Sequence, residues 1–68
     1  MNTYRVKRID LSAVNNVNEY WEAVKRAQVV YCNGLKALSV YCGGKLHRQR
    51  GGGYSGINGN IEYVAEKV

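Results

Sequence analysis

The sequence contains no phenylalanine and no proline, and it has a single histidine. Because phenylalanine is absent, the aromatic area belongs to one tryptophan and six tyrosines, whose amphipathic rings suit interfaces as well as cores. The only cysteines are Cys32 and Cys42, and only His47 lies near them in the sequence. This set does not have the spacing of a zinc site, so we expect no metal and no cofactor.

Long apolar runs are also missing. No stretch approaches the roughly 18 apolar residues that a membrane-spanning helix needs, and the first residues do not form the apolar core of a secretory signal. We therefore expect a cytoplasmic protein with no membrane partner, in which Cys32 and Cys42 are reduced packing residues. A single disulfide between them is geometrically conceivable, and the sequence leaves that alternative open.

Acidic residues are scarce, with five Asp and Glu against ten Lys and Arg, which leaves a net charge of +5. This balance favours an anionic partner, although solubility alone would also explain it. The 68 residues make one domain, 1–68, with a modest core. Such a domain is marginally stable unless a partner or a small homo-oligomer contributes, and both monomer and small homo-oligomer remain open.

One long helix is predicted from Asn16 to Asn33. Its apolar residues recur at gaps of three and four, which places Tyr20 and Trp21 on a core-facing stripe. Asn16 and Glu19 have the spacing of a capping box, and the glycine after Asn33 suits a helix end. Because Trp21 is expected in the core, truncating it should unfold the domain.

Strands are predicted on both sides of this helix. Alternating residues indicate a first strand over Thr3–Leu11, with a bulge near Lys7 and Arg8 where the apolar phase shifts. Leu35–Cys42 is apolar on both faces and is predicted to be a central strand. The remaining strands are expected over Lys45–Arg50 and Ile61–Val68, with a short strand at Tyr54–Ile57.

Two turn signals join these segments. Gly43-Gly44 predicts a hairpin, with a two-residue loop that pairs Cys42 with Lys45 or a three-residue loop that sets Leu46 beside Cys42. Asn58-Gly59 predicts a second tight hairpin, with a type I′ turn that joins Tyr54–Ile57 to Asn60–Tyr63. The expected fold is therefore α+β in βαβββ order: an antiparallel β-sheet of about four strands, one α-helix packed on one face, and the other face free for binding.

Catalytic constellations are not evident. His47 and Cys42 have no third group to orient them, and the glycines at 51–53 lack the Lys-Ser/Thr of a phosphate-binding loop. We therefore expect no enzyme.

The strongest functional signal is a basic run followed by glycines. Lys45–Arg50 holds three permanent cations and no acid, and Tyr54 follows the glycines as an aromatic on a flexible loop. Arginines can bind phosphates and a tyrosine can stack on a base. The same pattern would also be found in an edge strand whose charges only keep it soluble and prevent pairing with other chains. Cations on the first strand are expected to extend this surface. The predicted partner- or nucleic-acid-binding residues are Arg5, Lys7, Arg8, Lys45, His47, Arg48, Arg50 and Tyr54.

In layout, the chain resembles small phage-encoded inhibitor proteins of the anti-CRISPR kind. The resemblance is carried by the βαβββ order over Thr3–Val68, the turns at Gly43-Gly44 and Asn58-Gly59, and the lack of a catalytic set. It implies a non-enzymatic protein, acting in the host cytoplasm, that blocks a nucleic-acid-handling protein or ribonucleoprotein complex by surface contacts. The alternative is a domain that binds RNA or DNA directly through the basic strand and the glycine-rich loop.

Overall fold

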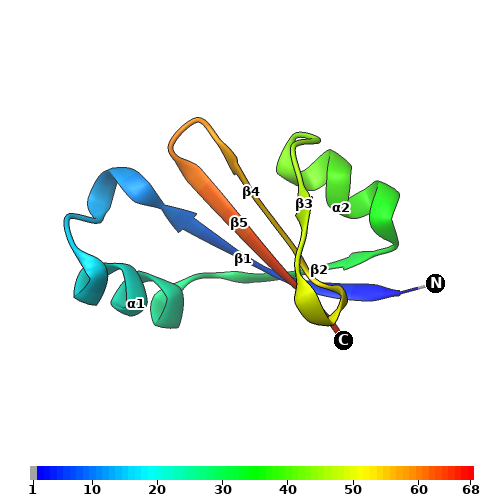
Figure 1. Ribbon diagram of the computed structural model, residues 1–68, viewed down its shortest axis with the longest axis horizontal. Helices are drawn as coiled ribbons and strands as arrows, with labels where there is room; N and C mark the ends of the chain where they lie inside the picture. The colour runs from blue at the N-terminus through cyan, green and yellow to red at the C-terminus, as the bar shows by residue number, and fades with distance from the viewer. Residues whose placement is uncertain (1) are drawn as a thin grey trace.

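The structure is a computed structural model that describes residues 2–68. Its regular elements are two helices, α1 (Val17–Arg26) and α2 (Leu35–Cys42), and five strands, together with the short 3-10 turns η1 (Leu11–Ala13) and η2 (Arg50–Gly52). The strands are β1 (Thr3–Asp10), β2 (Val29–Asn33), β3 (His47–Arg48), β4 (Tyr54–Asn58) and β5 (Ile61–Lys67). They form one antiparallel sheet in the order β2-β1-β5-β4-β3 (Figure 1). The predicted α+β class and antiparallel sheet are confirmed, with one more strand and one more helix than expected.

Helix α1 begins where the capping signal predicts. The Asn16 side chain accepts a 2.9 Å hydrogen bond from the backbone N–H of Glu19, and the Glu19 carboxylate accepts one back from the Asn16 amide. The helix ends at Arg26 rather than at Asn33, so the prediction of one long helix is wrong. The residues after Arg26 include Val29 and Val30, whose branched side chains suit a strand, and they pair with β1 as β2.

The segment Leu35–Cys42 is a helix, where a central strand was predicted. Leu, Lys and Ala are strong helix formers, and the buried Leu38 and Cys42 lie one turn apart on one side of α2. Gly43 ends the helix in the left-handed conformation, and the N–H groups of Gly43 and Gly44 donate to Val40 and Ser39. This Schellman motif replaces the predicted Gly43-Gly44 hairpin, so neither proposed loop register applies.

The hairpin predicted at Asn58-Gly59 is present, but its loop lies one residue later than predicted and is not a type I′ turn. Asn58 pairs with Ile61, which leaves Gly59 and Asn60 as a two-residue loop between β4 and β5. Gly59 has a φ of 64°, a value that glycine adopts without strain at the first loop position of a type II′ turn.

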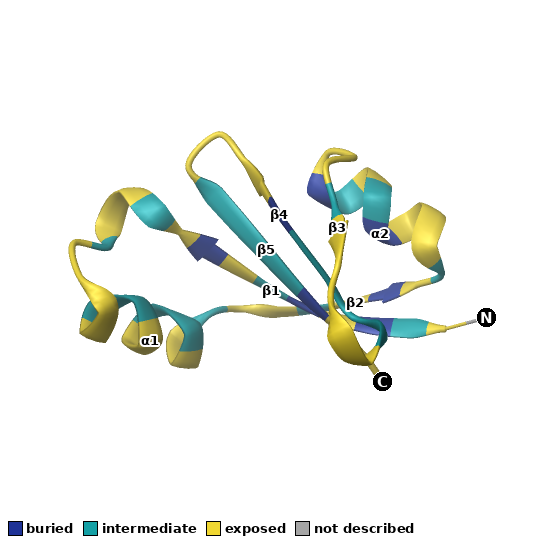
Figure 2. Ribbon diagram, viewed as in Figure 1, coloured by how far each residue is buried: buried dark blue, intermediate teal, exposed yellow. Residues whose placement is uncertain are grey.

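The two helices cover opposite faces of the sheet. Alternate residues of a strand point to opposite faces, so Tyr4 and Val6 share one face and Ile9 lies on the other. Tyr4 and Val6 are buried with Leu38 and Cys42 of α2, whereas Ile9 is buried on the side of α1. Figure 1 shows the helices at opposite ends of the sheet, and Figure 2 shows buried stretches on α2, on β2 and along β1, including the β1 arrowhead toward α1.

This arrangement also explains the apolar phase shift in β1. The strand pairs with β5 in one unbroken register from Tyr4 to Asp10, so the predicted bulge near Lys7 and Arg8 is absent. The apolar residues change phase because β1 buries one face under α2 and the opposite face under α1. The sheet face that carries Ile9, Lys7 and Ser55 is uncovered beyond α1, and we name it the open face.

Candidate functional site

The basic run lies at one edge of the sheet. Strand β3 is only two residues long and is the last strand in the sheet order. His47 is paired with Ser55 and points to the open face, while Arg48 is paired with Tyr54 and points to the opposite face. Lys45 precedes β3 and Arg50 begins η2, and both side chains are exposed. We name Lys45, Arg48 and Arg50 the basic edge.

The cations of the basic edge are not neutralised by neighbouring acids. Within residues 2–68 the ion pairs are Arg5 with Glu66, at 2.5 Å, and Lys25 with Glu22, at 3.8 Å. Neither pair includes Lys45, Arg48 or Arg50. Exposed cations that are left unpaired keep their full electrostatic attraction for an anionic partner. The basic edge is therefore suited to binding an anion.

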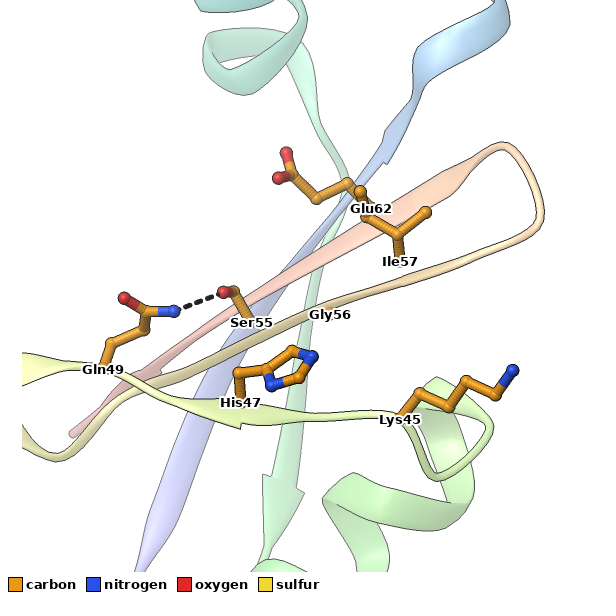
Figure 3. Close-up of a pocket in the computed structure, with 7 residues that line it drawn as sticks. All are labelled: Lys45, His47, Gln49, Ser55, Gly56, Ile57 and Glu62. Carbon is orange, nitrogen blue, oxygen red and sulfur yellow. Dashed lines mark hydrogen bonds between the residues drawn. The ribbon is translucent and has the colours of Figure 1, made fainter.

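A shallow groove of about 360 Å³ runs beside the basic edge on the open face. It is lined by Lys45, His47, Gln49, Ser55, Gly56, Ile57 and Glu62 (Figure 3). The Gln49 amide donates a 2.7 Å hydrogen bond to the Ser55 hydroxyl, which ties the segment after β3 to β4. The groove mixes apolar, hydroxyl, amide, cationic and carboxylate groups, a combination of apolar and polar groups that is typical of protein interfaces.

Gly56 allows two backbone segments to approach closely beside this groove. A Cβ at Gly56 would collide with the carbonyl oxygen of Lys45. The absence of a side chain therefore lets the segment Lys45-Leu46 lie directly on β4. This contact, together with the hydrogen bond between Gln49 and Ser55, fixes the position of Lys45 at the edge of the sheet.

The groove also contains a serine, a histidine and a glutamate, but they are not assembled as a catalytic triad. The Ser55 hydroxyl accepts its hydrogen bond from Gln49. The Glu62 carboxylate accepts a 2.6 Å hydrogen bond from the hydroxyl of Tyr20, and Figure 3 shows it turned away from His47. No hydrogen bond joins His47 to Ser55 or Glu62 among residues 2–68, whereas a nucleophile needs a base within hydrogen-bond reach.

The two thiols lie on the other side of the sheet. Cys32 and Cys42 are both buried in the core under α2, and both are free. Burial, and to a lesser degree the neighbouring Cys32, raise the pKa of the Cys42 thiol to about 11. Cys42 is therefore protonated at neutral pH, which makes it a poor nucleophile, and it packs as a small apolar residue.

The predicted first-strand cations do not join the basic edge. Strand β1 is separated from β3 by β5 and β4. Arg5 and Lys7 point to the open face, where Arg5 is paired with Glu66, and Arg8 points to the opposite face beside Tyr63. The charges of β1 thus form separate positions rather than one continuous basic surface.

Tyr54 is not at the tip of a flexible loop, as the glycine-rich stretch had suggested. It begins β4, is half-buried, and packs edge-to-face on Tyr4 with ring centroids 5.8 Å apart. The preceding glycines form η2, and the N–H of Gln49 donates to the carbonyl of Gly53 across it. With its ring held in the core, Tyr54 is not available to stack on a base.

Two exposed features of the structure are not predicted from the sequence. Lys67, at the end of β5, lies against Gly52 of η2 and so adds a cation near Arg50. Trp21 is 57% exposed, which overturns its predicted place in the core. The stripe that faces the sheet is Tyr20, Ala23, Val24 and Ala27, and Trp21 lies at its margin. Neither feature is signalled by a local pattern in the sequence.

Within residues 2–68, no helix has the length and apolarity to cross a membrane, and no three acidic, histidine or cysteine side chains gather as metal ligands. Comparison of the chain with family models, curated proteins and solved structures finds no match.

Proposed function

We propose that this is a non-enzymatic binding protein that docks its basic edge on an anionic surface of a nucleic-acid-handling complex and so blocks that complex. The mode of action is that of the small phage-encoded inhibitors that the sequence layout resembles. The observation that carries the proposal is the basic edge itself, in which Lys45, Arg48 and Arg50 are exposed and make no ion pair with the described residues.

The groove favours a complex over free nucleic acid as the partner. Binding to free nucleic acid through a few phosphates is weak at physiological salt, because each contact contributes through counterion release. Base stacking would strengthen it, but Tyr54 is packed on Tyr4 and the basic edge itself contains no aromatic side chain. The groove beside the edge exposes Ile57 together with polar groups, which supplies the additional contacts that a protein surface would use.

Direct binding to RNA or DNA is the second candidate. It is favoured by the absence of any acidic residue from Lys45 to Asn60, although the Glu62 carboxylate lines the groove beside Lys45. Arginine also binds phosphate oxygens in a bidentate manner, and two of the three cations are arginines.

The test is a charge reversal at the edge. In the variant Arg48→Glu with Arg50→Glu, we expect binding to be lost while the far-UV circular dichroism is unchanged, since both side chains are exposed. The matched control is Lys25→Glu with Arg26→Glu, which changes the net charge equally on the exposed side of α1.

Two measurements separate the candidates. Each protein is immobilised and exposed to a nuclease-treated bacterial lysate, and each is titrated with short labelled DNA and RNA at several salt concentrations. A complex that is retained by the wild type and the control, but not by the edge variant, supports the proposed function. Nucleic-acid binding at physiological salt with a steep salt dependence supports the second candidate. Equal behaviour of the edge variant and the control would refute both.

A further inference from the structure

The two outer edges of the sheet are built differently. At one end, β3 is two residues long and is flanked by the cations of the basic edge, as is usual for edges that must not pair with another chain. At the other end, β2 is five residues long, and residues 27–35 include no charge, no proline and no bulge. The β2 edge therefore lacks the features that keep edge strands apart.

The register shows which backbone groups of β2 face outward. The N–H of Gly34 donates to the carbonyl of Asn2, so this pair is hydrogen-bonded. Hydrogen-bonded pairs alternate along an antiparallel ladder, so the pairs Tyr4–Cys32 and Val6–Val30 are also hydrogen-bonded to β1.

The residues between them, Val29, Tyr31 and Asn33, direct their N–H and C=O groups away from the sheet. These outward groups have no backbone partner within residues 2–68. The outer edge of β2 therefore presents three residues with unpaired donors and acceptors, spaced as in a regular strand.

The same residues expose apolar side chains. Val29 is 40% exposed and Tyr31 is 63% exposed, and both lie on the open face. An edge that combines unpaired backbone groups with exposed apolar area is the arrangement that adds a further strand.

We propose that a second copy of this chain pairs with β2, strand to strand and antiparallel, about a two-fold axis at Tyr31. In this register Val29 faces Asn33 of the second copy, and Tyr31 faces its own counterpart. Each outward residue thus meets an outward residue, so every free donor finds an acceptor. The β2 edge is self-complementary in the sense that a two-fold dimer requires.

The charge distribution also favours a second copy. The basic edge is four strands away from β2, and in the dimer the two basic edges would be separated by roughly 40 Å of sheet, at about 4.8 Å per strand. That separation is several times the Debye length of about 8 Å at physiological salt. Two chains of charge +5 can therefore meet at β2 without strong repulsion between their basic edges.

The strength of the dimer follows from its size. Five residues of strand span about 17 Å, and a single strand edge covers much less than the roughly 800 Å² per partner of a typical stable interface. We therefore expect weak, concentration-dependent association in the micromolar range or above. The dimer does not depend on the proposed function, because it leaves both basic edges exposed.

Sedimentation velocity over low-micromolar to near-millimolar concentration, with reductant present, tests the proposal. The wild type should sediment increasingly as a dimer as its concentration rises. Tyr31→Lys and Tyr31→Glu should each associate at least about tenfold more weakly, since each places like charges opposite one another across the axis. An equimolar mixture of the two variants should recover association, because lysine then faces glutamate.

The control pair is Val40→Lys and Val40→Glu, at a side chain that is 76% exposed on α2. These variants should associate as the wild type does, and circular dichroism should show all four variants folded. A wild type that stays monomeric throughout would overturn the proposal. So would Tyr31 variants that associate normally, or a Tyr31 mixture that associates no better than either variant alone.

Discussion

The variant Gly56→Ala tests whether the close approach of two backbone segments positions the basic edge. Gly56 is buried in β4, and its added Cβ would collide with the carbonyl oxygen of Lys45. Gly56 does not have a positive φ, so alanine meets no conformational strain there and the effect is steric. The obstruction is a backbone atom, which cannot rotate away as the end of a long side chain would.

The magnitude follows from overpacking. Forcing an extra methyl group into a packed contact costs about 1–3 kcal/mol, from which the lower unfolded-state entropy of alanine subtracts about 0.5–1 kcal/mol. We expect Gly56→Ala to lower the free energy of unfolding by about 1–2 kcal/mol. A 68-residue domain has a total of about 3–10 kcal/mol, so the loss is measurable.

Urea unfolding followed by circular dichroism measures this loss, with Ile57→Val as the control, since it changes the other neighbouring residue, whose side chain is 53% exposed, without adding volume. Amide NMR shifts locate the strain, and the largest changes should fall at Lys45 and Leu46. If Gly56→Ala matched the control within about 0.5 kcal/mol and left those two amides unshifted, the close approach would not exist in solution.

Three further predictions concern the two packing layers. Leu38→Ala should cost about 2–5 kcal/mol, because Leu38 is 0% exposed under α2, and a urea midpoint near that of wild type would contradict its place in the core. Trp21→Ala should cost less than about 2 kcal/mol, and global unfolding in a thermal melt would show instead that Trp21 is buried. Burial and the hydrogen bond to Glu62 raise the pKa of Tyr20 from 10.0 to about 12. The folded state thus favours the protonated phenol, so its contribution is complete below pH 10 and is lost as the pH rises to about 12. Tyr20→Phe should flatten stability over that range in pH-dependent melts, and parallel curves for variant and wild type would refute the assignment.

Signals carried by a few neighbouring residues were read correctly from the sequence. The Asn16 cap and the hairpin at Asn58-Gly59 each depend on local hydrogen bonds or φ preferences; the cap is confirmed, and the hairpin forms with its loop one residue later than predicted. The end of α1 depends on distant residues instead. Helical spacing continues past Ala27 to Val30 and Tyr31, yet those residues pair with β1, a partner some 25 positions earlier in the chain.

The error at Leu35–Cys42 has a different origin. Eight residues with apolar side chains on every side fit a buried strand and a short helix equally well by periodicity. The adjacent Gly43-Gly44 is typical of a hairpin turn, but glycine is equally the usual residue after a helix. Helix propensity favoured the correct answer, but that preference is weak over a short segment.

For the candidate site, the exposure of the basic run can be predicted from the sequence, whereas the residues that lie beside it in the fold cannot. Charges at an edge remain solvated in almost any fold, so Arg48 and Arg50 are exposed as expected. Tyr54 looked free because glycines precede it, but β4 carries it onto Tyr4. Likewise, the separation of Arg8 from the edge depends on the strand order, which no local pattern encodes.

The position of the only tryptophan gives this domain a built-in optical reporter. Trp21 lies on α1 against the ring of Tyr20, at 5.3 Å between centroids, and on the opposite side of the sheet from the core under α2. Its fluorescence therefore senses the docking of α1, whereas far-UV circular dichroism senses the whole chain. Coincident transitions for the two signals in urea would mean that β1 couples both layers into one cooperative unit, and an earlier change in emission would mean that α1 detaches first.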